Sequence, residues 1–395
     1  MGVTINLSTH SHRRLLIVLA AMTMFTPMAI DMYLPAFPSL AADLNVHISD
    51  LQLTLTSFLI GVAIGQLFWG PISDRFGRKA PSYFGIALYI GASVACTFST
   101  SLTTLIVLRF FQAFGGSAAL VCGRAMVRDL LHGVEMAKMM SAMAMLFVFA
   151  PAFAPTIGST VLKFFSWHAI FWSLVLFAIL VAFGMRTLPE SLAPESRNDH
   201  GFSDAAKSYG ELVKSKEFRT ASLIGISGSM VTFAYVSSAP AVLMGEYGVS
   251  RSTFGILFGL ISIGLITSSR VNIWLVGRYG LVTMMRGFTS VQTSATVAVL
   301  VIAITHAPLW LLLFFVVITF GCAPGLGGNA MTYGMHPFPH KAASAAALLG
   351  SLQFVGSAFI SGVLAFFHAN VILNMAVAMV AGALLAFIQV RRLVV

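Results

Sequence analysis

The chain has 395 residues, of which 58% are hydrophobic and only 9% are Asp, Glu, Lys or Arg. Soluble globular proteins carry about 25% charged residues, so this composition excludes a soluble protein and predicts one embedded in a membrane along its whole length. The net charge of +10 does not indicate nucleic-acid binding, because no basic stripe is interleaved with aromatic residues on a soluble surface.

Twelve apolar stretches follow one another, each close to the roughly 20 residues that a helix needs to cross a bilayer. They are apolar on all sides rather than at every second residue, which excludes a transmembrane β-barrel and leaves helices. Charged residues, Pro and Gly mark the breaks, and the predicted helices are residues 14–37, 49–71, 80–99, 102–127, 136–161, 166–187, 219–244, 252–276, 282–304, 308–331, 341–367 and 370–390. The predicted fold class is an all-α polytopic membrane protein.

The longest polar stretch, from Pro189 to Glu217, lies almost at the midpoint of the chain. It predicts an N-terminal six-helix bundle (1–187), a cytoplasmic linker (188–218) and a C-terminal six-helix bundle (219–395). Lys and Arg accumulate in cytoplasmic loops. Placing both termini in the cytoplasm puts these residues on that side, where they are expected to contact anionic lipids, with three exceptions: Lys163, Arg251 and the intramembrane Arg109.

The two halves look like diverged copies of each other. The segment GRAM at 123–126 in the fourth helix parallels GNAM at 328–331 in the tenth. The segment RFG at 75–77 parallels RYG at 278–280 at a similar offset. Two parallel repeats with a substrate site at their interface are a transporter architecture.

The loop at 70–79 (GPISDRFGRK) connects the second and third helices. A tight turn between antiparallel helices uses glycine where the chain needs a positive φ or a close approach, which predicts a backbone role for two glycines. The charged residues can pair with one another or with lipid phosphates, holding the helix ends together in one conformation and releasing them in another. A positive-inside loop with a turn glycine is the plainer interpretation. The expected gating residues are Gly70, Asp74, Arg75, Gly77, Arg78 and Lys79.

This decapeptide matches the GxxxDRxGRK loop of the major facilitator superfamily at every defined position. The segment AIDMYLP at 29–35 resembles the IDMYLP signature of its Bcr/CflA drug-resistance branch, the bicyclomycin-resistance-like transporters. LRFFQA at 108–113 and SWHAIF at 166–171 are similar to the LRFxQ and SWxxIF segments of that branch. The resemblance covers essentially the whole chain. It implies two pseudo-symmetric six-helix bundles that export varied small molecules in exchange for protons.

Asp31 lies inside the first apolar stretch, whereas the other acidic residues can be placed in loops or at helix ends. A carboxylate within the membrane costs several kcal/mol, so it usually faces a cavity or a partner on a proton or substrate pathway. Removal from water favours its protonated form, which would let it load and unload protons. A carboxylate satisfied near the outer membrane face is the alternative.

Arg109 is the natural counter-charge for Asp31, because the fourth helix places it at a comparable depth from the outer face. We expect the two to pair when the site is empty, so that protonation or substrate binding changes the pair and the conformation. The alternative is an arginine that holds helices together through backbone carbonyls.

Asp129, at the cytoplasmic end of the fourth helix, resembles the acidic residue that the family places against the loop between helices two and three. The resemblance implies a network between Asp129 and Arg78. Arg270 in the eighth helix has no acid in its span and is interpreted either as a cavity charge or as a snorkelling residue.

The fifth helix contains Pro151, Pro155 and Gly158 among small residues. Prolines four apart predict a bend, and small residues allow close packing against a neighbouring helix. The segment is similar to the GPxxGG antiporter motif, although Ala154 and Ser159 stand where that motif has glycines.

The substrate cavity is expected between the halves, lined by helices one, four, five, seven, eight and ten. Flexible Met and aromatic side chains suit promiscuous recognition. The candidate lining residues are Tyr33, Gln112, Met143, Phe147, Phe233, Tyr235 and Asn329.

No arrangement of histidines or carboxylates indicates an enzyme, and a passive channel would need a continuous polar lining. The expected function is a proton-coupled exporter of small drug-like molecules in the bacterial inner membrane. It would use the proton gradient, no metal and no cofactor, and one chain would suffice as a monomer. The alternative is a carrier dedicated to one metabolite, such as a nucleoside or an amino acid, that exports or imports it.

Overall fold

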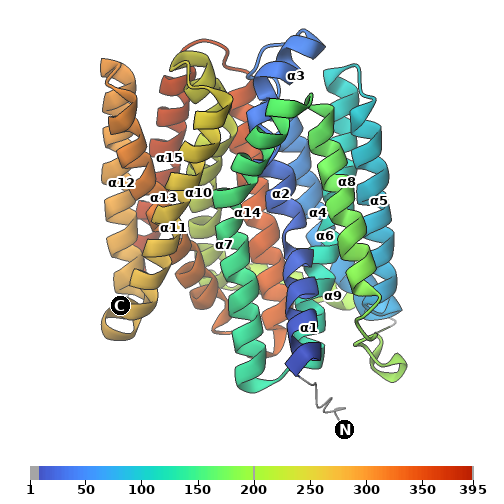
Figure 1. The fold of residues 1–395 in the computed structure, drawn as a ribbon. Helices are drawn as coiled ribbons and strands as arrows, with labels where there is room; N and C mark the ends of the chain where they lie inside the picture. The colour runs from blue at the N-terminus through green and yellow to red at the C-terminus, as the bar shows by residue number, and fades with distance from the viewer. Residues whose placement is uncertain (1–8, 199–200, 394–395) are drawn as a thin grey trace.

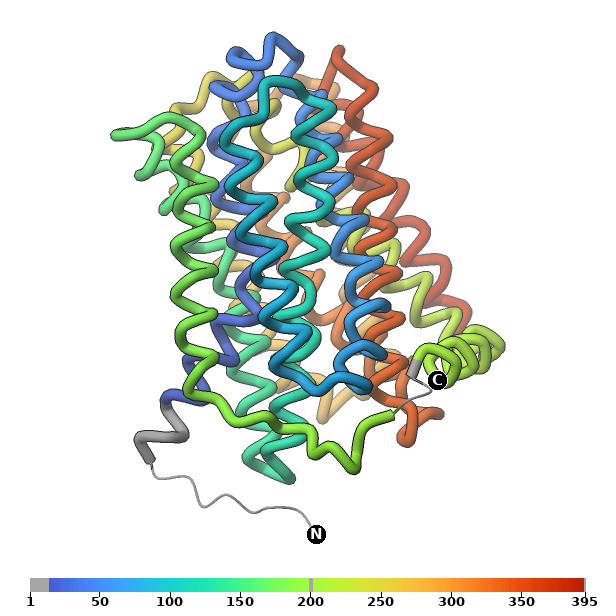
Figure 2. Tube along the Cα trace, turned by 90° about the vertical axis from the view of Figure 1, so that its right-hand side faces the viewer, coloured from blue at the N-terminus to red at the C-terminus, as the bar shows by residue number. Residues whose placement is uncertain are grey.

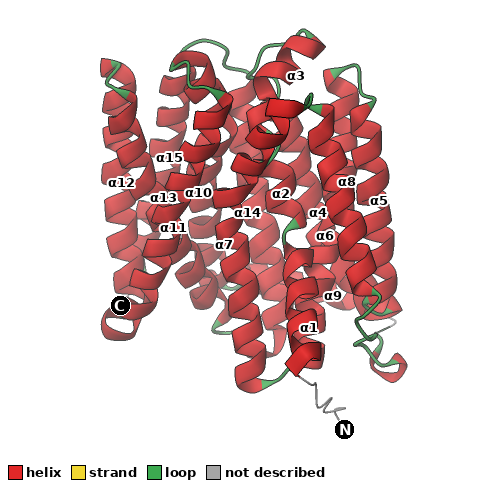
Figure 3. Cartoon of the chain, in the orientation of Figure 1, coloured by secondary structure: helices red, strands yellow, loops and turns green. Residues whose placement is uncertain are grey.

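The structure is a computed structural model that describes residues 9–198 and 201–393. Within these residues it contains helices and no strand (Figure 3). The α-helices are α1 (Thr9–Thr23), α2 (Phe25–Asp31), α3 (Phe37–Leu44), α4 (Gln52–Phe76), α5 (Lys79–Thr97), α6 (Leu102–Leu130), α7 (Gly133–Phe164), α8 (His168–Met185), α9 (Gly201–Lys214), α10 (Lys216–Ala239), α11 (Arg251–Tyr279), α12 (Leu281–Thr305), α13 (Leu309–Met335), α14 (Ala342–Ala365) and α15 (Val371–Arg391). Four short helices accompany them: η1 (Leu34–Ala36), η2 (Pro194–Ser196), η3 (Pro240–Glu246) and η4 (Pro339–Lys341).

Among the described helices, eleven are long and apolar enough to cross a membrane, and a bent pair, Arg14–Thr23 with Phe25–Leu44, supplies a twelfth span. The predicted all-α polytopic fold is confirmed, and eleven predicted spans coincide with observed helices to within a few residues at each end. The spans run between two ends of the bundle (Figure 1). We call them the α3 end, where α3 lies, and the linker end, where α1 begins and α9 lies.

The first span is not the single helix 14–37 that the sequence predicted. α1 stops at Thr23, α2 stops at Asp31, and the two parts of the span are inclined by 49°. Both breaks lie four residues before a proline. Pro27 has no N–H to donate to the carbonyl of Thr23, and Pro35 has none for that of Asp31.

The break after Asp31 also changes the hydrogen bonding of one further backbone group, the carbonyl of Ala29. The N–H of Tyr33 donates to the carbonyl of Ile30, three residues earlier, at 3.2 Å. In a continuous α-helix that N–H would have bonded Ala29. The carbonyl of Ala29 therefore needs a donor from another helix.

Two helix pairs join the first half of the chain to the second. In the first pair, α4 packs along α14. The hydroxyl of Ser361 donates to the carbonyl of Gln52 at 3.2 Å, and that of Ser351 donates to the carbonyl of Ala63 at 2.9 Å. Small side chains thus let the two helices approach from the α3 end down to the middle of the bundle.

In the second pair, α7 packs against α11. Ser159 donates to the carbonyl of Arg251 at 2.8 Å. A Cβ on Gly259 would lie 3.0 Å from the carbonyl oxygen of Ala152. Both contacts belong to the half of each helix that lies toward the α3 end.

The other half of this pair is not packed. The buried residues of α11 all fall between Phe254 and Ser262, although the helix continues for more than four further turns. Ile273 on α11 is exposed, as are Val134 and Met145 on α7. The two helices therefore touch near the α3 end and separate toward the linker end.

The linker contains the helix α9, which the sequence did not predict because only one of its faces is apolar. Leu212 is fully buried together with Phe218 of α10 and Leu349 of α14. Glu211 forms an ion pair with Lys341, which precedes α14. Figure 2 shows α9 lying across the linker end, and it packs against α4 as well as α10 and α14. The linker therefore contains a folded helix that packs against both halves of the chain.

α7 passes the second break of the first span at very short distance. A Cβ on Gly158 would lie 2.3 Å from the carbonyl oxygen of Met32, so only glycine permits this approach. The close packing that the sequence predicted for this segment is made there. Pro151 and Pro155 lie inside α7, which continues as one helix, and their effect on its curvature stays a prediction.

Gly158→Ala should destabilise the protein, because the new methyl group must push two backbones apart. Overpacking of this kind costs about 1–3 kcal/mol. Gly70→Ala is the matched control, since nothing lies within 4 Å of a Cβ there, and it should not destabilise the protein, because a helix interior favours Ala over Gly. Thermal unfolding in detergent compares the two, and equal Tm values would show that the contact with Met32 is not tight.

Candidate functional site

Asp31 ends α2 inside the membrane-spanning part of the chain. Its side chain is buried, with only 5% of the residue exposed. No residue in the described part of the chain donates a hydrogen bond to its carboxylate or pairs with it. A buried carboxylate without a partner is costly in a membrane and usually marks a proton or substrate pathway.

Arg109 lies in α6 and is fully buried. Its Nη2 donates to the carbonyl of Ala29 at 3.0 Å, and its Nη1 donates to Oε1 of Gln112 at 2.6 Å. The guanidinium also lies over the rings of Phe58 (4.2 Å) and Tyr33 (4.6 Å). Arg109 therefore supplies the donor that the break after Asp31 takes away from Ala29, and it ties α2 to α6.

The expected ion pair between Asp31 and Arg109 is not present in this conformation. The guanidinium is instead held by a backbone carbonyl, an amide and two aromatic faces. This is the alternative that the sequence left open, an arginine that joins helices through backbone groups. Whether Arg109 also serves proton coupling stays a prediction.

Three of the residues expected to line the substrate cavity are fully buried: Tyr33, Gln112 and Tyr235. The hydroxyl of Tyr33 lies 3.1 Å from that of Thr54, and Gln112 donates to Ser93 at 2.8 Å. Both complete the surroundings of Arg109. The ring of Tyr235 packs between aromatic side chains of the second half.

The remaining lining candidates differ in exposure. Met143 and Asn329 are buried, whereas Phe147 and Phe233 are half-buried. Asn329 and Asn272 exchange two amide hydrogen bonds, at 2.9 and 3.2 Å, which join α13 to α11. In this conformation Phe147 and Phe233 each keep part of their side-chain surface exposed, where a substrate can contact it.

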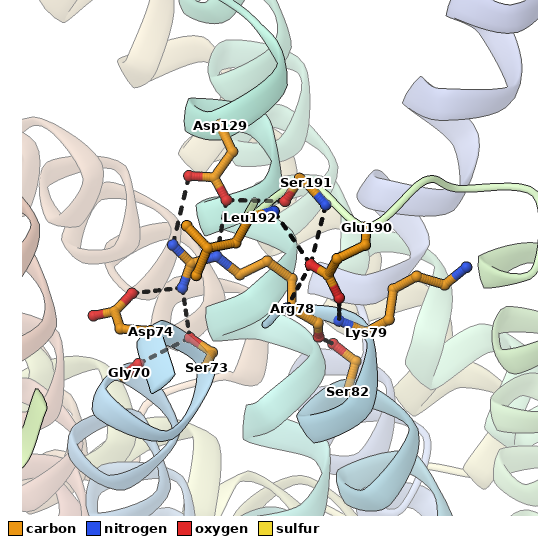
Figure 4. A network of polar contacts seen from close by, with 10 residues as sticks. All are labelled: Gly70, Ser73, Asp74, Arg78, Lys79, Ser82, Asp129, Glu190, Ser191 and Leu192. Carbon is orange, nitrogen blue, oxygen red and sulfur yellow. Dashed lines mark hydrogen bonds and ion pairs between the residues drawn. The ribbon is translucent and has the colours of Figure 1, made fainter. Parts of the chain in front are cut away.

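A second polar cluster surrounds the turn between α4 and α5 (Figure 4). Arg78 is buried, and its Nε donates to Asp129 at 2.8 Å while its Nη1 donates to Asp74 at 2.5 Å and to Ser73 at 2.9 Å. Burial alone would lower the pKa of Arg78, but the hydrogen bonds to Asp129 and Asp74 outweigh it and hold that pKa above its usual value. The implied contact between Arg78 and Asp129 is confirmed.

Glu190 completes this cluster, and the sequence did not single it out. Its carboxylate accepts hydrogen bonds from the backbone N–H groups of Arg78 (2.8 Å), Lys79 (3.0 Å), Ser191 (3.0 Å) and Leu192 (3.2 Å). Partial burial alone would raise the pKa of Glu190, but these N–H groups outweigh it and hold the pKa below its ordinary value of 4.5. The one sequence signal for this contact was the first turn of α5, which contains no acidic residue of its own to bind its free N–H groups.

The two glycines of this turn differ. Gly77 has a φ of +87°, so its predicted backbone role is confirmed. The prediction for Gly70 is wrong, because α4 continues through it to Phe76 and no neighbour approaches its Cα. Lys79 bonds the carbonyl of Leu188 through Nζ at 2.7 Å, whereas Arg75 is exposed outside the cluster.

Within the described part of the chain, no three His, Cys, Asp or Glu side chains are placed to share a metal ion. The three cysteines, Cys96, Cys122 and Cys322, are buried and unpaired.

Glu190→Gln should lower the Tm at neutral pH, because a neutral amide accepts weakly from the four N–H groups. The loss is about 1 kcal/mol or less, as for an exposed helix cap. The pKa of Glu190 is lowered in the folded state, so its contribution is present above pH 4.5 and is lost as the pH falls through the lowered value. The Tm difference from the native protein should therefore shrink in acid. Glu195→Gln, in the same exposed loop, is the control, and an equal loss there would refute the cap.

Comparison with known proteins agrees with the helical, membrane-spanning fold described above. Residues 19–361 match the family described as the Major Facilitator Superfamily. The chain is 36% identical over 357 residues to an uncharacterized MFS-type transporter, YdgK, of Bacillus subtilis, with 87% of this chain and 86% of that protein covered. It is 33% identical over 354 residues to a bicyclomycin resistance protein homolog of Haemophilus influenzae, covering 89% and 88%.

The multidrug resistance protein MdtL of Escherichia coli is 29% identical over 344 residues, covering 87% of this chain and 86% of that protein. Among solved structures, the partially occluded inward open conformation of the xylose transporter XylE from E. coli matches with a TM-score of 0.71 over 94% of this chain and 96% of that chain. That pair is 15% identical, so the match concerns the fold alone. The chain belongs to the Major Facilitator Superfamily of membrane transporters, as its loop at 70–79 implied.

Proposed function

We propose that this chain is a proton-coupled exporter of small drug-like molecules in a bacterial inner membrane. Family membership accounts for transport, and relatives named for bicyclomycin and multidrug resistance favour drug-like substrates. The observation that carries the proton coupling is Asp31, a buried carboxylate in a span with no partner among the described residues.

The contacts around Asp31 give a route from protonation to movement. Arg109 binds the carbonyl of Ala29, two residues before Asp31, and its Nε is buried without an acceptor in the described residues. A neutral Asp31 leaves this arrangement undisturbed. An ionised Asp31 competes with the Ala29 carbonyl for the guanidinium, because a charged acceptor binds more strongly.

When Arg109 releases the carbonyl of Ala29, the resulting shift of α2 would reach α7. Met32 follows Asp31 directly, and Gly158 of α7 rests on its carbonyl. On the same turn of α7, Thr156 and Ser159 bond the backbone of α11. A shift of α2 is thus transmitted to a helix pair that joins the two halves of the chain.

We assign the linker end to the cytoplasm, with both termini there, because Lys and Arg are concentrated on that side. The separation of α7 from α11 then faces the cytoplasm, so the conformation is open inward. The moving parts are the two six-helix bundles, residues 1–187 and 219–395, connected by the linker 188–218. The substrate would enter between them and contact Phe147 and Phe233.

Asp31→Asn should abolish transport driven by a pH gradient, because the amide cannot exchange a proton. Proteoliposomes with an imposed gradient and a panel of labelled drugs that includes bicyclomycin give the measurement. Passive exchange of a bound drug should survive, which separates lost coupling from lost folding.

Asp43→Asn is the matched control, since this carboxylate accepts from Nε1 of Trp167 at 2.7 Å in the same half of the chain. It should leave gradient-driven transport unchanged. Equal transport by native protein and Asp31→Asn would remove Asp31 from the coupling mechanism.

An outward-open conformation should bring the separated halves of α7 and α11 together. The helices are antiparallel, and Ala152 already lies opposite Gly259. In the same register, the residues two turns closer to the linker end are Met145 on α7 and Ile266 on α11, which lie opposite each other. A Met145→Cys, Ile266→Cys pair should form a disulfide during transport and block it reversibly. The pair Met145→Cys, Trp274→Cys is out of register and should not cross-link, and equal cross-linking by both pairs would contradict the register.

A further inference from the structure

Three side chains connect the two halves of the chain at the α3 end. Nε2 of His368, in the loop between α14 and α15, lies 2.7 Å from Oδ1 of Asp50. The ring of His368 also stacks on that of His47, with centroids 4.7 Å apart and planes inclined by 17°. The backbone N–H of His47 donates to Oδ2 of Asp50 at 3.0 Å, so these two residues form one unit before α4.

This cluster lies at the top of the contact between α4 and α14. Directly below it, Ser361 bonds the carbonyl of Gln52, and a Cβ on Gly362 would lie 3.2 Å from the side chain of Thr56. α4 and α14 cannot separate at the α3 end unless Asp50 also leaves His368.

We propose that Asp50, His47 and His368 form a latch between the two halves, and that the proton on His368 sets how readily the α3 end opens during transport. These are positioning residues, since they act on the helix pair below them rather than on substrate. The latch is independent of Asp31 and of which drug is carried.

The direction of the effect follows from the charges. Histidine is the side chain that gains or loses its charge between about pH 5 and 8. With a proton on His368, its bond to Asp50 is charge-assisted and about twice as strong as a neutral one. Acid on this side therefore closes the latch, and rising pH loosens it.

Two other acidic groups at this end are engaged elsewhere. Glu246 of η3 accepts from the backbone N–H of Ile372 at 3.3 Å, and Asp43 accepts from Trp167. The titratable groups that contact His368 within the described residues are Asp50 and His47.

The test measures access to Ser361, which is fully buried under the latch. Ser361→Cys is labelled with a membrane-impermeant maleimide added on the α3 side of proteoliposomes at pH 5.5 and pH 8. The three native cysteines are buried and provide the background. Each latch variant is compared with the native latch at the same pH, so the pH dependence of thiol reactivity cancels.

At pH 5.5, His368→Ala and Asp50→Asn should label about two- to five-fold faster than the native latch, the range for a partly exposed ion pair. At pH 8 the difference should shrink, because only the weaker neutral hydrogen bond is then lost. His368→Arg keeps a permanent charge and should label slowly at both values. His368→Gln keeps a hydrogen bond without a titrating charge, and its ratio to His368→Arg should not depend on pH.

His168→Ala and Asp43→Asn are the controls, because these residues lie at the same end but bond within the first half. Acceleration by a control, or an equal ratio at both pH values for His368→Ala, would overturn the latch. Absence of labelling in every variant would do the same, since it would mean that α4 and α14 do not part at this end. None of these readouts needs drug transport, so failure of the proposed function and failure of the latch are distinguishable.

Discussion

The structure depends on the absence of water around its helices. In hydrocarbon, a backbone carbonyl or guanidinium without a partner costs several kcal/mol, so one broken turn obliges another helix to supply a donor. Pro35 causes the break after Asp31, the break frees the carbonyl of Ala29, and Arg109 reaches across from α6 to bind it. Gln112, Tyr33 and Phe58 are then required around Arg109. A single proline thus accounts for the contacts that surround Arg109.

The two ends of the bundle are stabilised in different ways. At the linker end, Arg78, Asp129 and Glu190 connect the first half to the start of the linker, and α9 packs across both halves. At the α3 end, contacts between side chains and backbones join the halves directly. The first half is thus braced internally at the linker end and joined to the second half at the α3 end.

The sequence predicted the spans well because the length of an apolar run is set by the thickness of the bilayer. It missed the broken first span because that run is long and apolar enough for one helix despite Asp31, and the effect of a proline appears on a carbonyl four residues earlier. The contact between Arg78 and Asp129 was predicted from the family resemblance. The sequence could not find Glu190, because which residue caps α5 depends on how the chain after α8 folds back. The expected pair of Asp31 and Arg109 was wrong for this conformation, since charge alone does not show that a freed carbonyl lies nearer.

The position of Glu190 has a consequence for how the protein is made. Its carboxylate binds the start of α5, from which it is separated by 112 residues along the chain. At a synthesis rate of about 5–20 residues per second, α5 waits roughly 6–22 s for this cap. During that interval the exposed N–H groups at its start must be served by water or lipid headgroups. The turn between α4 and α5 therefore reaches its final form only after the last span of the first half has left the ribosome, which makes the emergence of Glu190 the step that completes this half.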